Sequence, residues 1–308
     1  MKIETIKELE KCEICPRKCK VNRLKGEKGF CNLGTEVKVA LVSSHDFEEP
    51  CISGASQDTK SSGTVFFSNC NLRCVFCQNH EISAEGKGKI ITVERLAEIF
   101  LEQQERKVNN INLVTPTMYA YQIIEAIKIA KAKGLHIPII YNSNGYESVE
   151  TIKALNGYID VYLPDLKYYS DDIAVKYSSA PHYFEIATKA IKEMYNQVGS
   201  PVFDENGIIQ KGVIIRHLIL PNHVQNTKRI LKWIKENMPK DIYVSVMAQY
   251  FPTYQAKNME KINRKITIKE YREVESYLYT LDLENGYMQD LGKHEEEYVP
   301  EFDFRGVE

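Results

Sequence analysis

The 308-residue sequence lacks any long hydrophobic run. No segment approaches the roughly eighteen uninterrupted apolar residues that suggest a membrane-spanning helix. The first residues, MKIETIKELEK, are charged where a secretory signal peptide would be apolar. The sequence therefore predicts a cytoplasmic protein that does not interact with a membrane.

An excess of basic residues is also missing. The 40 Lys and Arg residues are balanced by 42 Asp and Glu residues, and the formal net charge is -2. Proteins that bind the phosphate backbone are usually basic, so nucleic acid is not an expected partner. The composition is that of a globular protein, and the length suits one large α/β barrel with a small appendage.

From residue 64 onward, short β-branched runs alternate with amphipathic helical patterns. This alternation predicts a parallel sheet, and six βα units predict a partial (βα)6 TIM-like barrel in place of the complete eight-unit form. The expected strands are residues 64–68, 111–115, 137–141, 159–163, 213–220 and 243–247. The expected helices are residues 92–107, 120–134, 146–157, 174–195 (interrupted before Pro181) and 225–239.

Residues 1–60 do not follow this alternation. They contain four clustered cysteines and a possible strand at residues 37–44, and we expect them to form a small cysteine-rich, metal-binding module. Residues 61–308 would then be the barrel with a C-terminal extension. The stretch 200–212, with Asn206-Gly207 at its centre, predicts a hairpin before the fifth strand.

Seven of the eight cysteines fall into two groups, and only Cys51 stands apart. In a reducing compartment such groups indicate metal binding or chemistry more often than disulfides. Cys70, Cys74 and Cys77 directly follow the first expected strand, at the barrel end where active sites lie. Three thiolates leave one iron of an iron-sulfur cluster open, which is typical of a reactive site. A Cys3His zinc site completed by His80 is the alternative.

The Cys-x3-Cys-x2-Cys spacing after a first strand, with Phe76 between the last two cysteines, resembles the radical S-adenosylmethionine enzymes. The resemblance implies a [4Fe-4S] cluster on Cys70, Cys74 and Cys77 whose open iron binds S-adenosylmethionine. An electron from the cluster would cleave this cofactor to methionine and a 5'-deoxyadenosyl radical for hydrogen abstraction. The reaction would require an electron donor such as flavodoxin or ferredoxin.

Three segments, GTVFFSNCNLRCVFCQN, VYLPDLKYY and IIRHLILPN, are similar to the pyruvate formate-lyase activating enzyme and its poorly characterised relatives. The similarity covers roughly residues 60–250. It implies hydrogen abstraction from a glycine of a partner glycyl-radical enzyme. A radical enzyme that modifies a small molecule or peptide is the alternative, and a non-catalytic metal or electron-transfer protein is a weaker one.

The same resemblance implies positions that contact the cofactor. Lys167 would face the methionine carboxylate, and the segment YNSNGY would approach the ribose. Adjacent strand residues point to opposite faces, so only one of Arg216 and His217 can face inward, and His217 is expected on the adenosine side. VTPTMY replaces the family's Gly-Gly-Glu segment. The expected cofactor-binding residues are Phe76, Thr115, Thr117, Asn142, Ser143, Asn144, Asp165, Lys167, His217 and Met247.

The second cysteine group is Cys12, Cys15, Cys19 and Cys31. Four thiolates complete a tetrahedron, so this set predicts a second metal centre, either zinc or an auxiliary [4Fe-4S] cluster, and spacing alone does not choose between them. A similar N-terminal segment occurs in the poorly characterised relatives and is absent from the short activating enzymes. His45, Glu48 and Glu49, which follow in the sequence, are candidate substrate-side groups.

Overall fold

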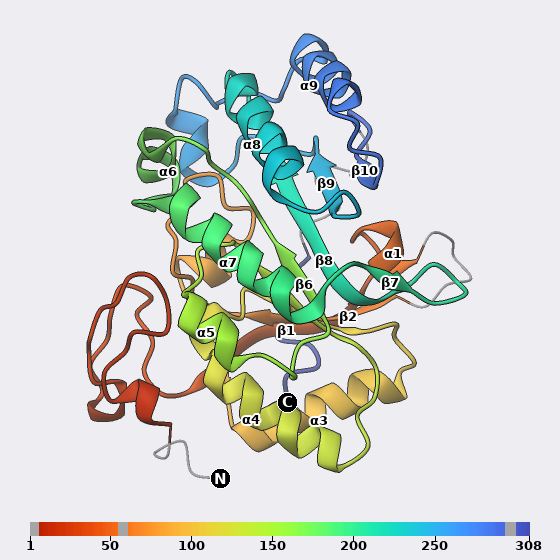
Figure 1. The fold of residues 1–308 in the computed structure, drawn as a ribbon. Helices are drawn as coiled ribbons and strands as arrows, with labels where there is room; N and C mark the ends of the chain where they lie inside the picture. Colours follow the sequence, from red (N-terminus) through yellow and green to blue (C-terminus); the bar gives the residue numbers. More distant parts are fainter. Residues whose placement is uncertain (1–5, 55–60, 293–299) are drawn as a thin grey trace.

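A computed structural model describes residues 6–54, 61–292 and 300–308. Its centre is a sheet of parallel strands that lie next to one another in the order in which they occur in the chain (Figure 1). These strands are β2 (Ser62–Phe67), β4 (Ile111–Val114), β5 (Ile139–Ser143), β6 (Val161–Pro164), β8 (Ile209–Leu218) and β9 (Tyr243–Met247). The predicted α/β fold with a six-stranded parallel sheet is confirmed.

Additional strands extend this sheet at both edges. β1 (Val37–His45) pairs antiparallel with β2, and β3 (Lys89–Ile91) pairs antiparallel with β1. β10 (Gly286–Met288) lies parallel to β9 at the other edge. β7 (Val202–Phe203) and β8 form the hairpin predicted over residues 200–212. The strand expected at residues 37–44 therefore belongs to the same sheet as the barrel strands.

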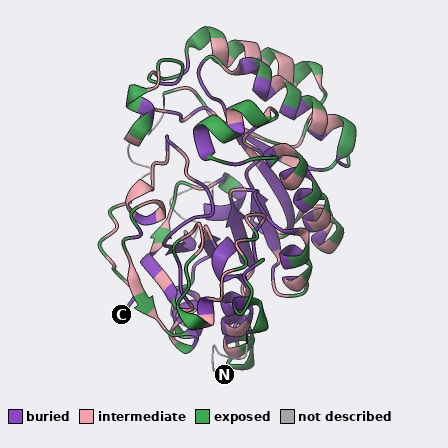
Figure 2. Cartoon of the chain, turned by 90° about the vertical axis from the view of Figure 1, so that its left-hand side faces the viewer, coloured by how far each residue is buried: buried purple, intermediate pink, exposed green. Residues whose placement is uncertain are grey.

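Helices cover the outer face of the sheet, and the strands beneath them are buried (Figure 2). Thr92 caps α3 by accepting a hydrogen bond from the Arg95 backbone N–H at 3.0 Å. No helix in the described part of the chain is long and apolar enough to cross a membrane. The helices are α1 (Pro50–Ser53), α2 (His80–Ser83), α3 (Val93–Glu105), α4 (Ala120–Ala132), α5 (Val149–Ala154), α6 (Asp171–Ser178), α7 (Tyr183–Val198), α8 (Val224–Asn237) and α9 (Ile268–Thr280).

The inner face of the sheet has its own small apolar core, built around α1. Cys51 and Ile52 of this helix are buried against residues from β5, β6 and β8: Ile140, Val161, Leu163, Ile209 and Ile214. The Ile52 carbonyl accepts a hydrogen bond from Asn110, just before β4, at 2.9 Å. The short helix therefore closes the barrel near the amino ends of the strands, and Cys51 packs there as a small apolar side chain.

The four-cysteine segment packs on the side of the barrel, beside α4 and α5 (Figure 1). Thr151 of α5 donates a hydrogen bond to the Ile14 carbonyl at 2.6 Å. The buried Arg23 donates to the Met118 carbonyl at 3.0 Å. These contacts fix the cysteine segment against the same end of the sheet at which the strands β4 and β5 finish.

Candidate active site

A cavity of about 590 Å³ lies at the carboxyl ends of the parallel strands. Its walls come from the loop after β2 and from the ends of β4, β5, β6, β8 and β9. Cys70, Cys74 and Cys77 all line it. The fold therefore brings the three thiols to one space, which is large enough for an organic ligand of several hundred Å³.

The Cys70 sulfur is held by groups from two loops. The Leu72 backbone N–H donates to it at 3.3 Å, and Asn144 Nδ2 approaches it at 3.4 Å. Asn144 Nδ2 also donates to Asn71 Oδ1 at 2.7 Å, and Asn71 Nδ2 donates to the Tyr146 carbonyl at 2.7 Å. This network ties the cysteine loop to the loop that follows β5.

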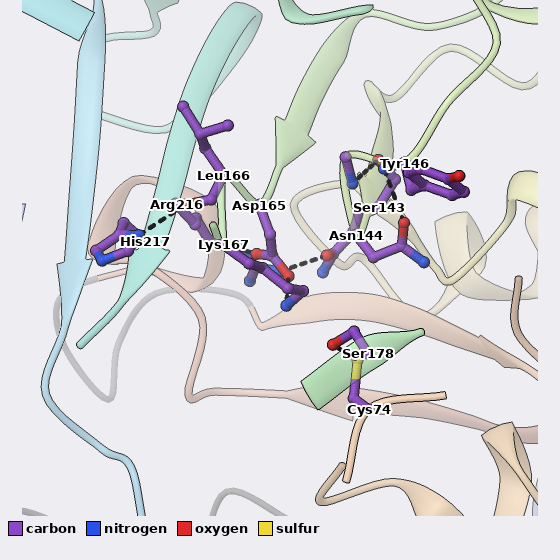
Figure 3. Close-up of polar contacts among 12 residues, drawn as sticks. Cys74, Ser143, Asn144, Tyr146, Asp165, Leu166, Lys167, Ser178, Arg216 and His217 are labelled. Carbon is purple, nitrogen blue, oxygen red and sulfur yellow. Dashed lines mark hydrogen bonds and ion pairs between the residues drawn. The ribbon is translucent and has the colours of Figure 1, made fainter. Parts of the chain in front are cut away.

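Serine hydroxyls lie beside the other two sulfur atoms. Ser178 Oγ donates to Cys74 Sγ at 3.0 Å, and Ser83 Oγ lies 3.2 Å from Cys77 Sγ. The Cys74–Ser178 pair is drawn in Figure 3. Hydrogen bonds to cluster sulfurs orient the ligands and tune the reduction potential. These serines are therefore placed to orient Cys74 and Cys77.

The chemistry of this donor set fits a [4Fe-4S] cluster. Burial raises the pKa of Cys70 to about 12 and that of Cys74 to about 11, and a bound metal centre would offset this effect because it binds the thiolate form. Across the described residues, no three His, Cys, Asp or Glu side chains converge as ligands of a single ion. A cluster does not require such convergence, because each thiolate binds a different iron. His80 stacks on Tyr254, with ring centroids 4.7 Å apart, and does not line the cavity.

Buried charges form a network on the opposite wall of the cavity (Figure 3). Asp165 pairs with Lys167 Nζ at 2.5 Å and with Arg216 Nε at 3.1 Å. Arg216 also contacts Glu48 Oε2 at 3.3 Å and Asn142 Oδ1 at 2.6 Å. Burial raises the pKa of Asp165, but the charges of Lys167 and Arg216 outweigh this effect and hold the pKa below its usual range.

The prediction that His217 faces the cofactor is wrong. Its side chain is fully buried on the other side of β8, where Nδ1 lies 2.6 Å from the Leu166 carbonyl and Nε2 lies 2.9 Å from Thr227 Oγ1. Figure 3 shows it turned away from Asp165 and Lys167. Strand alternation then places Arg216 inward. Burial lowers the pKa of His217 to about 4, so it is a neutral structural residue.

The two threonines of VTPTMY have separate environments. Thr115 lines the cavity with φ 61°, the left-handed conformation that glycine adopts most readily. Thr117 does not reach the cavity, which corrects the prediction for it: its hydroxyl is buried and donates to Glu147 Oε1 at 2.6 Å. Burial raises the pKa of Glu147 to about 7. The chain turns inward between these residues, so only the first side chain remains at the strand end.

Residues 64–205 match the family model for the radical SAM superfamily. The chain is also 33% identical over 299 residues to an uncharacterised protein of Methanocaldococcus jannaschii. This alignment covers 92% of this chain and 79% of that protein. This chain belongs to the radical SAM superfamily. It is therefore an enzyme of radical SAM chemistry, and the family implies a [4Fe-4S] cluster and S-adenosylmethionine as its cofactors.

Two further proteins are more distantly similar to this radical SAM enzyme. It is 29% identical over 117 residues to the pyruvate formate-lyase-activating enzyme of Clostridium pasteurianum, which covers 35% of this chain and 46% of that protein. The crystal structure of Streptococcus suis SuiB bound to S-adenosylmethionine has a TM-score of 0.50 and 18% identity. The match covers 77% of this chain and about half, 52%, of the SuiB chain, and it shows a shared fold.

The remaining predicted cofactor residues of the radical SAM enzyme also line the cavity: Phe76, Asn142, Ser143, Asn144 and Met247. The Phe76 ring packs edge-on against Tyr250 at 5.8 Å between centroids. Gly145 is required for the close approach of the β5 and β6 loops, since a Cβ there would lie 2.1 Å from the Asp165 carbonyl oxygen. Of the ten predicted positions, Thr117 and His217 are the two that lie elsewhere.

The four N-terminal cysteines line a separate pocket of only about 10 Å³. The Phe30 backbone N–H lies 3.4 Å from Cys19 Sγ. Gly29 packs so closely that a Cβ there would lie 2.8 Å from the same sulfur. Burial raises the pKa of Cys15 to about 12. The chain thus wraps around these sulfurs and leaves no room beside them for an organic ligand.

The four-cysteine segment contacts the three-cysteine loop directly. The guanidinium groups of Arg17 and Arg73 both lie over the Phe30 ring, at 3.8 Å and 4.4 Å from its centroid. Asn69 Nδ2 donates to the Cys31 carbonyl at 2.9 Å. Since Asn69 immediately precedes Cys70, one short path of bonded and hydrogen-bonded atoms links the two cysteine groups.

Ser83, Ser178 and Glu49 are functional candidates whose geometry the sequence does not show. The two serines contact cluster cysteines, and Ser178 does so from α6, far along the chain. Glu49, a candidate substrate-side group from the sequence, lines the cavity, and its burial is what the structure adds. The signal for Glu49 in the sequence is a pair of acidic residues directly before Pro50 and the apolar residues Cys51 and Ile52. No local sequence feature distinguishes Ser178 from other serines.

Proposed function

We propose that this enzyme abstracts a hydrogen atom from a substrate carbon, and that a glycine of a partner glycyl-radical enzyme is the first candidate donor. The similarity to the pyruvate formate-lyase-activating enzyme of Clostridium pasteurianum supports this candidate. When bound, the cluster and S-adenosylmethionine supply the 5'-deoxyadenosyl radical. The observation that carries the proposal is the presence of three cysteines and the Asp165–Lys167 pair around one cavity.

Each group in this proposal has one task. Cys70, Cys74 and Cys77 hold the cluster, and their neighbouring hydroxyl and amide groups orient the sulfurs. Lys167 binds the carboxylate of S-adenosylmethionine, because a buried ammonium and a carboxylate form a strong charge-assisted hydrogen bond. Asp165 keeps this ammonium in place at 2.5 Å. The barrel wall excludes water from the radical.

A small molecule or peptide is the second candidate substrate. The packing of α1 inside the barrel favours it, since residues 45–50 line the cavity beside this helix. In either case we propose that Cys12, Cys15, Cys19 and Cys31 bind a separate zinc ion or auxiliary [4Fe-4S] cluster. Flavodoxin or ferredoxin would supply the electron.

Anaerobic reconstitution with iron and sulfide tests the proposal. The wild-type protein should bind one SAM-responsive cluster and form 5'-deoxyadenosine after reduction, and Cys74→Ala should form none. Cys51→Ala is the control, since Cys51 is a buried cysteine of α1 that packs in the inner core and does not line the cavity, and this variant should keep the product. Formation of 5'-deoxyadenosine by Cys74→Ala would contradict the cluster assignment.

The glycine candidate has its own measurement. Incubation of the reduced enzyme and S-adenosylmethionine with a glycyl-radical enzyme should give the glycyl doublet in the electron paramagnetic resonance spectrum. Formation of 5'-deoxyadenosine without this doublet, across the glycyl-radical enzymes encoded beside the gene, would favour the small-molecule or peptide substrate.

A further inference from the structure

Glu49 is a buried carboxylate at the cavity with an oxygen that no protein group satisfies. The residue is only 9% exposed, and its Oε2 has no hydrogen-bond partner among the described residues. Glu49 lines the cavity. A carboxylate removed from water without a partner is costly, and nearly all buried polar groups in proteins are paired. This oxygen therefore indicates a partner that arrives with a ligand.

The backbone around Glu49 is held firmly in place. Cys51 and Ile52, directly after it, are buried in the inner core of the barrel. Ser53 Oγ donates to the carbonyls of Asp46 and Glu48, both at 3.1 Å. The Glu49 carbonyl accepts a hydrogen bond from the Ile52 backbone N–H at 2.7 Å. Because its neighbours are anchored on both sides, Glu49 is presented to the cavity by a fixed turn.

The nearby cations are already committed to other carboxylates. Arg216 donates one hydrogen bond from each nitrogen, to Asp165, Glu48 and Asn142, and none of these goes to Glu49. Lys167 pairs with Asp165. Glu48 is satisfied on its other oxygen by Asn112 Nδ2 at 3.1 Å. An ionised Glu49 would thus add a negative charge that the local network does not balance.

The charged residues that line the whole cavity also favour a cationic ligand, because carboxylates outnumber cations. Lys167 and Arg216 are the cations that line it in the described part of the chain, against the carboxylates of Asp46, Glu48, Glu49, Asp165 and Asp290. Burial raises the pKa of Glu49, and Arg216 lowers it by a smaller amount. A cationic ligand would restore the missing partner and allow the carboxylate to be ionised.

We infer that Glu49 binds a positively charged nitrogen of the substrate, an ammonium or guanidinium group, at the inner end of the cavity. The substrate is then a cationic molecule, either a free amine or a basic side chain of a peptide. The inference rests on the proposed function, because it assigns the substrate class of the same cavity. Glu48 and Arg216 hold the surrounding wall, and the ligand's nitrogen fills the position beside Glu49 Oε2.

The test uses reconstituted protein with S-adenosylmethionine present and measures binding by anaerobic calorimetry. The probes are n-butylammonium, as the free amine, and Nα-acetyl-lysine methylamide, as the peptide side chain. 1-Pentanol and Nα-acetyl-norleucine methylamide are their uncharged counterparts. We expect at least one cation to bind about 10-fold or more tightly than its counterpart, the scale of one charge-assisted hydrogen bond. The cation that binds more tightly shows whether the substrate is a free amine or a basic side chain of a peptide.

Glu49→Gln keeps the shape of the side chain and should remove this preference, while Glu49→Asp should retain part of it. Glu205→Gln makes the same change in charge on an exposed residue between β7 and β8, outside the cavity, and should alter the affinity by less than about 2-fold. Equal binding of cations and uncharged probes by the wild-type protein would overturn the inference. So would loss of S-adenosylmethionine affinity in Glu49→Gln with no effect on the probes.

Failure of the inference is distinguishable from failure of the proposed function. Wild-type protein that forms 5'-deoxyadenosine but does not prefer cations retains the proposed function and contradicts the role of Glu49. Wild-type protein that forms no 5'-deoxyadenosine contradicts the proposed function itself.

Discussion

The two cysteine groups of this enzyme are adjacent in space but differ in what surrounds their sulfur atoms. Cys70, Cys74 and Cys77 open onto a cavity of about 590 Å³ that also contains buried charges. The four N-terminal cysteines enclose about 10 Å³. A metal site with an open position supports reactions, whereas a closed site with four protein ligands is structural or transfers electrons. The difference teaches that the two groups are distinguished by the free space beside their sulfurs as well as by the number of cysteines, and the roles proposed for them follow from this difference.

The largest effect should follow from removing two ligands of the closed site. Cys15→Ala combined with Cys19→Ala should eliminate its metal and disorder residues 10–35, since small metal modules depend on the ion to fold. Hydrogen exchange should show lost protection at the backbone N–H groups of Cys12 and Lys20, which donate to Val21 and Cys12 at 2.9 Å. β1 should stay protected, and the barrel cluster should still assemble.

Unchanged exchange and unchanged metal content in this double variant would contradict the proposed second centre. Loss of both metal centres would show that the two sites form one cooperative unit, joined through Phe30 and Asn69. The two cysteine groups would then belong to a single metal-dependent domain.

The second prediction concerns the barrel wall behind the cavity. The pKa of His217 is lowered to about 4 in the fold, so between pH 6.5 and 4 the unfolded chain binds a proton that the native protein does not. The free energy of unfolding should therefore fall as the pH is lowered through this range, by about 3 kcal/mol from this residue. Urea titrations of the wild-type protein and His217→Gln measure it.

His217→Gln should be less stable at pH 8 but should lose less stability on acidification than the wild-type protein. His182→Gln, at an exposed position between α6 and α7, is the control and should preserve the wild-type pH dependence. Identical slopes for the wild-type protein and His217→Gln would show that the pKa of His217 is the same in the native and unfolded states, which would contradict its burial as a neutral residue.

The third prediction tests the open side of the catalytic site. Lys167→Ala should weaken binding of S-adenosylmethionine by about 1–3 kcal/mol, because a buried ammonium that pairs with its carboxylate is lost. Calorimetric titration of the reconstituted protein measures the change. Lys189→Ala, on the exposed face of α7, should bind as the wild-type protein does. If Lys167→Ala binds S-adenosylmethionine as tightly as the wild-type protein, Lys167 does not bind the cofactor and only pairs with Asp165.

The smallest effect is expected at Thr115, where a β-branched residue has φ 61°. The left-handed conformation costs about 1–2 kcal/mol for a residue with a Cβ, and glycine loses about 0.5–1 kcal/mol more on ordering. Thr115→Gly should therefore raise the free energy of unfolding by up to about 1 kcal/mol in urea titrations. A loss of more than 1 kcal/mol would show that the threonine side chain packs favourably at the cavity.

The sequence predicts the fold well, because the periodicities of strands and helices are local properties. The six strands and the break before Pro181 follow from such patterns, and so does the hairpin at residues 200–212. The pairing of β1 with β2 does not, since a strand's partner depends on the rest of the chain. The sequence does not predict α1 either, because its position depends on contacts of Cys51 and Ile52 with strands that are distant in the chain.

The sequence predicts the site residues that belong to a motif. It does not predict which of two adjacent strand residues faces the cavity. Cys70, Cys74 and Cys77 are close in sequence, and all three line the cavity. At Arg216 and His217, alternation requires opposite faces but does not say which residue is inside. Asp165, Glu48 and Asn142 decide it, because together they provide the partners of a buried guanidinium.

The central claim, that an open cluster site and a closed metal site coexist, is tested most directly by a variant with Cys70, Cys74 and Cys77 all replaced by Ala. After anaerobic reconstitution, iron and zinc are counted, and the reduced protein is examined by electron paramagnetic resonance with and without S-adenosylmethionine. The wild-type cluster signal should change when the cofactor is added, and the triple variant should keep one metal centre that does not respond. A triple variant that retains neither zinc nor iron would show that the N-terminal cysteines bind no metal, and a centre in it that still responds to S-adenosylmethionine would contradict the assignment of the open site.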